Sequence, residues 1–354
     1  MPILNTNLKI FNYPDKIRSL PGTVDEVLPP VHVRIKPTNI CNHDCWFCAY
    51  RQDDFQLGET MVERDQIPLD KMMEIVDDLI DMGVQAATFS GGGEPFVYPH
   101  LLKTVRRLAD SGIAFASLTN GSRLSGEVAE VFAAHGTWVR VSLDGWDGPS
   151  YARFRSVKET EFAKVLANME AFKKLGGRCV LSTVIVVGHE NGPHVHELVS
   201  RLAPLGMDSI KISPVIVSND GAENTAYHAQ HFDLVKDQVA RAIADFGHVT
   251  EISDAFHNQL QTFDKGYDWC PMLQVRPVIG ADLNIYSCQD KAYNPDGLLF
   301  SIKDRRFKDA WMASKAQFLR VDPTRHCNHH CVAHGSNKLL LEYLDADPDH
   351  VPFV

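Results

Sequence analysis

The residues of this chain best suited to metal chemistry are three closely spaced cysteines. Cys41, Cys45 and Cys48 follow an alternation of polar and apolar residues at 32–37, which predicts a strand that leads into the cysteine segment. Thiolates are soft ligands that bind iron–sulfur clusters and zinc. Three thiols on one loop can hold three irons of a 4Fe–4S cluster and leave the fourth iron open. A structural zinc site would need a fourth ligand, for which His43 is a candidate.

Four further cysteines lie near the C-terminus. Cys270 and Cys288 flank a predicted hairpin that turns at 280–284, so the two thiols would lie close together, and Cys327 and Cys331 would lie one turn apart if their segment is helical. Four thiolates can complete a 4Fe–4S cluster or bind zinc tetrahedrally. Four histidines near the last pair could contact substrate or act as replacement ligands, although surface or supporting roles are the more ordinary interpretation: His326, His329, His330 and His334.

A glycine-rich segment ends the next predicted strand. It reads Ser90-Gly-Gly-Gly-Glu-Pro95. Consecutive glycines let the backbone approach a ligand closely, and Glu94 offers a carboxylate there. Such a segment is also typical of a tight turn when it stands alone. Its position on the strand after the cysteine loop makes it a candidate part of the same site.

Together the two segments resemble the radical SAM enzymes. The pattern Cys-x3-Cys-x-aromatic-Cys resembles the signature loop of that family, and Gly92, Gly93, Glu94 and Pro95 resemble its Gly-Gly-Glu-Pro motif. The resemblance implies that the open iron binds the amino and carboxylate groups of S-adenosylmethionine (SAM). It also implies that residues 92–95 engage the amino group and that Phe47 packs near the adenine. The plain alternative for Phe47 is loop core.

Polar residues at later strand ends extend this candidate site. The resemblance implies that Ser142 and Asp144, which end the fourth predicted strand, contact the ribose or the carboxylate of SAM; the alternative is an ordinary strand end with an Asp-Gly turn. Arg140 and Lys211 are cations on the expected inner face of the sheet. A buried cation needs a partner, and the cofactor carboxylate, a substrate carboxylate or phosphate, and Asp144 all remain open.

The late cysteines resemble the twitch subtype of the SPASM-like extension. That resemblance implies one auxiliary 4Fe–4S cluster on Cys270, Cys288, Cys327 and Cys331, with zinc as the alternative. The chain departs from the family pattern at residues 282–284, where Asp-Leu-Asn replaces the usual Asp-Gly, and it lacks the further cysteines of a full SPASM domain.

Cys179 is left outside both groups. A single free cysteine is usually a small buried apolar residue. The functional alternative is a catalytic hydrogen-atom donor that quenches a substrate radical. Cys179 begins the fifth predicted strand, however, and sites on parallel barrels gather at the carboxyl ends of strands.

The elements that must position these residues alternate regularly. The patterns predict strands at 32–37, 85–90, 113–119, 138–143, 179–187 and 208–214 and helices at 68–83, 99–111, 125–135, 160–175, 194–203 and 230–246. Such alternation is typical of a parallel α/β sheet. Polar residues recur on one face of four strands (Thr88 and Ser90, Ser117 and Thr119, Arg140 and Ser142, Lys211 and Ser213), which favours a barrel interior.

The fold class is therefore predicted as α/β, with a partial (β/α)6 radical SAM barrel followed by a small auxiliary-cluster domain. We expect an N-terminal lead-in at 1–31 on the surface, the barrel core at 32–215, a connecting helical segment at 216–265 with a polar loop at 215–229, and the auxiliary-cluster domain at 266–354.

Composition restricts the class of protein. The 354 residues are 44% hydrophobic, which suffices for a full core, and no apolar run approaches the roughly 20 residues of a membrane span. No signal-peptide pattern precedes the eight cysteines, so we expect a cytoplasmic protein with metal ligands rather than disulfides. A net charge of −10 argues against a non-specific nucleic-acid surface.

The resemblance implies a reaction class. A reduced cluster would cleave SAM to methionine and a 5′-deoxyadenosyl radical, which abstracts hydrogen from a C–H bond of the substrate. We expect a small polar metabolite (a sugar, an aminocyclitol or a nucleotide-linked sugar), an oxidation or epimerisation, and a flavodoxin or ferredoxin-type electron donor. The alternatives are an enzyme that matures a ribosomally made peptide and, more weakly, a non-enzymatic zinc-binding protein.

Overall fold

A curved parallel sheet organises the chain. The structure is a computed structural model that describes residues 6–51, 57–260, 264–313 and 315–353. Ten strands form one sheet in the order β10-β9-β8-β1-β2-β3-β4-β5-β6-β7. Within the described residues, no helix combines the length and the apolar character that crossing a membrane requires.

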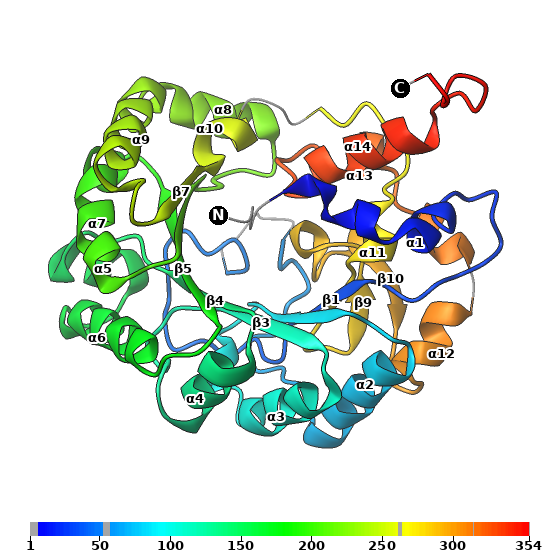
Figure 1. Ribbon diagram of the computed structural model, residues 1–354, viewed down its shortest axis with the longest axis horizontal. Helices are drawn as coiled ribbons and strands as arrows, with labels where there is room; N and C mark the ends of the chain where they lie inside the picture. Colours follow the sequence, from blue (N-terminus) through cyan, green and yellow to red (C-terminus); the bar gives the residue numbers. More distant parts are fainter. Residues whose placement is uncertain (1–5, 52–56, 261–263, 314, 354) are drawn as a thin grey trace.

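Six parallel strands form the predicted half-barrel. The strands are β1 (His32–Ile35), β2 (Ala86–Phe89), β3 (Ala114–Thr119), β4 (Trp138–Ser142), β5 (Val180–Val187) and β6 (Ser209–Pro214). The helices between them lie on the convex side of the sheet (Figure 1): α2 (Leu69–Asp81), α3 (Leu101–Ser111), α4 (Gly126–His135), α5 (Gly148–Arg155), α6 (Thr160–Lys174) and α7 (Val195–Leu202). The predicted partial (β/α)6 barrel is confirmed.

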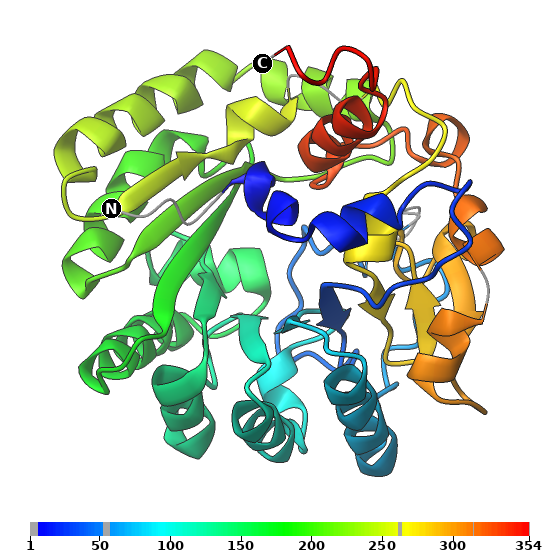
Figure 2. The ribbon, with the colours of Figure 1, turned by 45° about the vertical axis from the view of Figure 1, so that its right-hand side comes forward.

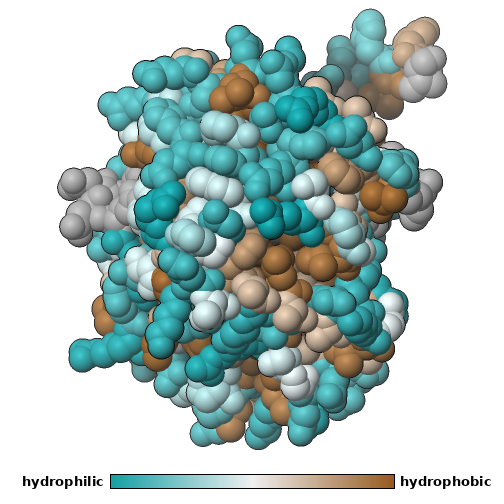
Figure 3. All heavy atoms as spheres, turned by 90° about the vertical axis from the view of Figure 1, so that its left-hand side faces the viewer, coloured by the Kyte–Doolittle hydropathy of each residue, from teal (hydrophilic) through white to brown (hydrophobic). Residues whose placement is uncertain are grey.

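The outer helices present polar surfaces to solvent and apolar surfaces to the sheet. In α2 the apolar side chains of Met72, Ile75, Val76 and Leu79 are buried against the sheet. The side of the molecule that carries α7 and α9 (Phe232–Phe246) is mainly hydrophilic, with apolar atoms near its centre and in smaller groups elsewhere (Figure 3). This division of surfaces is what holds amphipathic helices on a sheet.

The segment after β6 differs from its prediction. The expected polar loop contains α8 (Gly221–Ala229), whose N-terminal amides at Ala222 and Glu223 donate to the Asp220 side chain. The expected connecting segment adds a seventh parallel strand, β7 (Glu251–Asp254), before α10 (Ala255–Leu260). A strand this short gives little periodicity, so its pairing with β6 decides its conformation.

The C-terminal segment extends the sheet instead of forming a sheet of its own. β8 (Val278–Ile279) pairs in parallel with β1, and β9 (Asn284–Tyr286) and β10 (Leu298–Ser301) add antiparallel strands. The predicted hairpin turn is present, and the Gly280 amide donates to the Asn284 carbonyl at 2.8 Å. Leu283 adopts a φ of 64°, a left-handed conformation that glycine tolerates better. The remaining helices are α11 (Met272–Val275), α12 (Phe307–Met312), α13 (Pro323–His326) and α14 (His334–Leu344).

The N-terminal lead-in is packed more firmly than a surface segment. Short helices η1 (Asn7–Asn12) and α1 (Pro14–Arg18) lie beside α14 across the open side of the barrel (Figures 1 and 2). Their apolar side chains join a small cluster from both ends of the chain: Ile10, Ile17, Leu20, Met272, Val275, Ala333 and Leu340. Further short helices are η2 (Pro95–Val97), η3 (Gly192–His194), η4 (Ala203–Leu205), η5 (Gln289–Lys291), η6 (Pro295–Gly297) and η7 (Lys315–Leu319).

Strand register shows which polar residues face the barrel interior. Arg140 pairs with Ser182, and Val184 pairs with Lys211, so these cations lie on one face. Ser117 and Thr119 instead pair with Val139 and Val141, whose side chains belong to the core beneath the helices. The prediction that Ser117 and Thr119 line the interior is therefore wrong. Alternation separates the two faces of a strand but does not say which one is inside.

The indole of Trp311 joins the C-terminal segment to the N-terminal lead-in. It is fully buried, packs against Phe318 with the two ring centres 4.6 Å apart, and donates to the Leu28 carbonyl at 3.0 Å. We expect Trp311→Ala to lower the free energy of unfolding by about 3–5 kcal/mol, because it removes a large buried ring. Urea denaturation measures this loss. Met312→Ala, at an exposed neighbour, is the matched control, and equal losses in both variants would contradict the packing described.

Candidate functional site

The three N-terminal cysteines lie on the loop that follows β1. The Cys48 amide donates to the Cys45 carbonyl at 3.0 Å, and the Arg51 amide donates to the Cys48 carbonyl at 2.9 Å, so tight turns hold the end of the loop. The three side chains are partly buried. Burial raises the pKa of each thiol, that of Cys45 to about 12. A bound cationic iron would have to displace these protons, as metals do when they bind cysteine.

The glycine-rich segment packs directly on the cysteine loop. The Gly93 amide donates to the Thr38 carbonyl at 3.1 Å, and the Glu94 amide donates to the Ile40 carbonyl at 2.9 Å. A Cβ on Gly93 would lie 2.2 Å from the Ile40 carbonyl oxygen. Only glycine permits this backbone approach. Gly93 is thus needed for contact between the two loops, whereas the sequence suggested contact with a ligand.

The Glu94 side chain ties the end of β2 to the end of β3. Its carboxylate is buried and accepts hydrogen bonds from the Phe96 amide at 3.0 Å, the Thr119 hydroxyl at 2.7 Å and the Asn120 amide at 2.7 Å. Burial raises the pKa of Glu94, and these hydrogen bonds oppose the rise. The atom bonded to Asn120, Oε2, keeps one acceptor position. A contact from Glu94 to an amino group of SAM stays a prediction.

Lys36 links the same loops to the C-terminal segment. Its ammonium donates to the Gly91 carbonyl and, at 2.7 Å, to the Tyr50 hydroxyl. That hydroxyl donates in turn to the Gln289 carbonyl at 3.1 Å, one residue after Cys288. The two groups of cysteines are therefore joined through a continuous chain of buried contacts.

Arg155 is a site residue that the sequence reasoning missed. Its guanidinium donates to Asp144 and, at 2.9 Å, to the Ser142 hydroxyl, so both predicted strand-end residues have a protein partner. Burial alone would lower the pKa of Arg155, but attraction to Asp144 raises it above its usual value. Asp144 also accepts from the Val186 amide at 2.7 Å. Asp144 was one possible partner of Arg140 and Lys211, but it is paired with Arg155 instead.

The helix that ends at Arg155 also supports the cysteine loop. The carbonyl of Arg155 accepts from the Asp44 amide at 3.1 Å, and its guanidinium lies 5.7 Å from the centre of the Phe47 ring. A capping box between Asp147 and Ser150 starts this helix. That Asp-x-x-Ser pattern was the available sequence signal for α5.

His43, the candidate zinc ligand, points into protein. It is buried, it packs edge-on against Tyr151, and burial lowers its pKa to about 3. No described residue forms a hydrogen bond with either ring nitrogen. Across the described ranges, no three His, Cys, Asp or Glu side chains converge as the ligands of a single metal ion.

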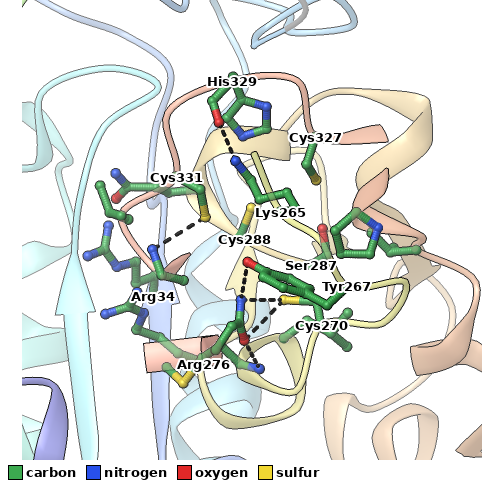
Figure 4. Close-up of a pocket in the computed structure, with 18 residues that line it drawn as sticks. Arg34, Lys265, Tyr267, Cys270, Arg276, Ser287, Cys288, Cys327, His329 and Cys331 are labelled. Atoms are coloured by element: carbon green, nitrogen blue, oxygen red, sulfur yellow. Dashed lines mark hydrogen bonds between the residues drawn. The ribbon is translucent and has the colours of Figure 1, made fainter. Parts of the chain in front are cut away.

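The four late cysteines share one pocket. Cys270, Cys288, Cys327 and Cys331 all line it, and Cys270, Cys288 and the pair Cys327 and Cys331 reach it from different segments of the chain (Figure 4). The pocket holds about 580 Å³ of space, part of it open to solvent. The Asn337 amide lies 3.2 Å from the Cys270 sulfur. Burial raises the pKa of all four thiols, that of Cys327 to about 11. The predicted grouping of these cysteines agrees with this arrangement.

The neighbouring histidines have mixed placements. His329 lines the pocket and its carbonyl accepts from Lys265 at 2.6 Å. His334 Nδ1 lies 3.1 Å from the Tyr267 hydroxyl, and His326 Nδ1 accepts from the Asp322 amide at 3.1 Å. These contacts hold the walls of the pocket.

Cys179 lies apart from both groups of cysteines. It precedes β5 at the amino end of the sheet and belongs to the hydrophobic core. Burial raises the pKa of its thiol to about 12. The eight residues of β5 place it more than 20 Å from the strand ends that carry the cysteine loop, at about 3.3 Å per residue. A catalytic hydrogen donor at Cys179 does not fit this position.

Comparison with known proteins agrees with this geometry. Residues 35–202 match the family model described as the radical SAM superfamily. A GTP 3′,8-cyclase of Rhizobium etli is 26% identical over 181 residues (50% of this chain, 49% of that protein). An S-adenosylmethionine-dependent nucleotide dehydratase of Flammeovirga pacifica is 24% identical over 183 residues (51% and 62%). The chain thus spans about half the length of the cyclase.

Two solved structures share the fold over most of the chain. Streptococcus suis SuiB bound to S-adenosylmethionine gives a TM-score of 0.62 at 16% identity, covering 88% of this chain and 72% of SuiB. anSMEcpe with bound AdoMet gives a TM-score of 0.59 at 17% identity, covering 89% and 96%. At these identities the likeness concerns the fold.

Gly93→Ala tests the contact between the two loops. The added methyl group would meet the backbone at Ile40, so the cysteine loop must shift. We expect anaerobically reconstituted Gly93→Ala protein to lose iron relative to wild type. Gly335→Ala is the matched control, because its Cβ would meet only the end of the Asn7 side chain. Unchanged iron content in Gly93→Ala would contradict the role given to this contact.

Arg155→Met tests the buried ion pair. Removing the guanidinium leaves Asp144 buried without its cation, which we expect to cost about 3–5 kcal/mol of unfolding free energy at pH 8. Burial raises the pKa of Asp144 in the folded protein, and removal of the Arg155 cation raises it further, so the loss should shrink as the pH falls through the pKa of Asp144 in the folded variant. Urea denaturation at pH 8 and 5.5 measures this, with the exposed Arg153→Met as control. A loss independent of pH would refute the assignment.

Proposed function

Because residues 35–202 place this chain in the radical SAM superfamily, we propose that Cys41, Cys45 and Cys48 hold a 4Fe–4S cluster and that SAM binds at its open iron. The observation that carries the proposal is the close contact between the cysteine loop and the loop at Gly93 and Glu94. This contact brings the thiols and the second strand end to the same carboxyl edge of the sheet, where parallel barrels place their chemistry.

The donor set fits such a cluster. Three partly buried thiols lie on one loop, and His43, which could have completed a zinc site, is packed against Tyr151. When bound and reduced, the cluster supplies a 5′-deoxyadenosyl radical from SAM. The role of the polypeptide is to hold the cofactor between the strand ends, to exclude water, and to keep the substrate C–H bond near the radical. We assign Phe47, Ser142 and the 92–95 segment to the cofactor.

We further propose that the pocket of late cysteines holds an auxiliary 4Fe–4S cluster. All four thiols line one cavity, and Asn337 contacts one of them. Such a cluster can accept the electron left after hydrogen abstraction, which would give an oxidation. The chain from Lys36 through Tyr50 to Gln289 connects the two regions. Zinc in this pocket is the alternative.

For the substrate we propose a small polar metabolite, such as a sugar, an aminocyclitol or a nucleotide-linked sugar. The polar inner face of the barrel supports this, with Arg140, Ser182 and Lys211 on the same face of three neighbouring strands. The curated relatives are named for reactions of nucleotides. The second candidate is a peptide-maturing enzyme, since one solved structure of SuiB has the precursor peptide SuiA bound. A flavodoxin or ferredoxin-type protein would supply the electron.

Cysteine variants separate the two clusters. Wild-type protein purified anaerobically should carry roughly eight irons, four per cluster. It should also cleave SAM to 5′-deoxyadenosine under dithionite. We expect Cys45→Ala to lose half of the iron and all of this cleavage, and Cys327→Ala to lose half of the iron but keep substrate-free cleavage.

Three results would count against the proposal. Zinc-loaded, colourless wild-type protein that leaves SAM intact would overturn it entirely. Zinc bound only at the late cysteines would replace the auxiliary cluster. Full cleavage by Cys45→Ala would remove the N-terminal loop from the site.

A further inference from the structure

Three cations converge on the inner face of the barrel. Arg34 on β1, Arg140 on β4 and Lys211 on β6 share that face by strand register. Arg276 joins them from the segment after α11, and Figure 4 shows it with Arg34 on one wall of the cysteine pocket. Arg140 rests 5.4 Å from the centre of the Trp138 ring, and its Nε donates to the Ser182 hydroxyl at 3.2 Å.

These cations repel one another on the partly buried inner face of the barrel. Burial, then Arg140 and Arg34, lower the pKa of Lys211 to about 8. Burial, then Arg276, lower the pKa of Arg34 to about 9. Two carboxylates act in the opposite direction: Glu251 on Arg140, and Asp290 on both Arg34 and Lys211. Two carboxylates face four cations here, so the region has an excess of positive charge that a bound anion would offset.

Several polar groups on this face have no protein partner. Among the described residues, the Arg34 Nε and the hydroxyls of Ser90 and Ser213 are buried without a hydrogen bond. In the same part of the chain, no hydrogen bond or ion pair involves the Lys211 ammonium. Buried polar groups in folded proteins are normally paired, so such a set is typical of a ligand site.

The clusters do not account for all of this charge. Arg34 and Arg276 line the pocket of the late cysteines and can offset four thiolates there. Arg140 and Lys211 do not line that pocket, and Asp144 already pairs with Arg155. The SAM carboxylate is a single charge at the carboxyl edge, whereas Arg140 and Lys211 lie in the middle of their strands.

We propose that Arg140 and Lys211 bind a phosphoryl group of the substrate. A phosphoryl group carries about −1.5 to −2 charge and three acceptor oxygens, which matches a guanidinium and an ammonium better than one carboxylate does. This inference rests on the proposed function and narrows it: the substrate is a phosphorylated small molecule, such as a nucleotide or a sugar phosphate.

Calorimetric titration of the anaerobic protein carrying both clusters and SAM tests this site. The probe is inorganic pyrophosphate, with the dicarboxylate succinate for comparison. We expect pyrophosphate to bind wild type more tightly than succinate and to weaken as KCl is raised. Lys211→Gln and Arg140→Gln should each weaken pyrophosphate binding roughly tenfold or more, Lys211→Arg should restore most of it, and the exposed Lys103→Gln should leave it unchanged.

The same titrations give the results that would contradict a phosphoryl site. Equal pyrophosphate affinity in wild type and both Gln variants, no binding to wild type, or tighter binding of succinate would each overturn the phosphoryl site. Iron content and circular dichroism identify a misfolded variant. If Lys211→Gln is misfolded, Lys211→Arg tests the site instead, because it keeps the positive charge and should retain most of the pyrophosphate binding. Substrate-free cleavage of SAM is measured on the same samples. If the wild-type protein cleaves SAM but does not bind pyrophosphate, only this inference is refuted. If it does not cleave SAM, the proposed function is refuted.

Discussion

The structure depends on one close backbone contact, between the cysteine loop after β1 and the glycine-rich loop after β2. The amides of Gly93 and Glu94 bind carbonyls of the cysteine loop, and no Cβ fits at Gly93. The Glu94 carboxylate then fixes the end of β3, because it accepts from the Thr119 hydroxyl and the Asn120 amide. Three neighbouring strand ends are thereby locked to the loop that carries the thiols, and a metal site at this edge needs such rigid support.

The rest of the site is arranged around this contact. Arg155 at the end of α5 pairs with Asp144, and its carbonyl holds the cysteine loop from the other side. Lys36 and Tyr50 extend the support to Gln289, and β8 pairs directly with β1. The C-terminal segment is therefore built into the barrel. A substrate on the inner face would lie between the two groups of cysteines.

Much of the fold and the grouping of the cysteines could be predicted from the sequence because their signals are local. The Cys41–Cys48 spacing places three thiols on one loop, and apolar periodicity predicted the six main strands and six of the helices. The expected turn forms even though Leu283 stands where the family pattern has glycine and therefore adopts a positive φ. The late cysteines were grouped by counting thiols, and the structure brings them to one pocket.

What could not be predicted depends on contacts between distant segments. The partner of Asp144 is Arg155, on a helix that the sequence reasoning did not identify. Ser117 faces the helices because register with β4 decides its side, and register is not visible in one strand. β7 is too short to show a pattern and is defined by its pairing with β6, and the predicted hairpin did not reveal that β8 would pair with β1.

The central claim is that an iron held by Cys41, Cys45 and Cys48 binds SAM directly. Electron–nuclear double resonance on the reduced Cys327→Ala protein, with SAM labelled by ¹⁵N in its amino group and ¹⁷O in its carboxylate, measures this contact. Our account predicts hyperfine coupling from both labels to the one remaining cluster. A reduced cluster that shows neither coupling at saturating SAM would contradict it.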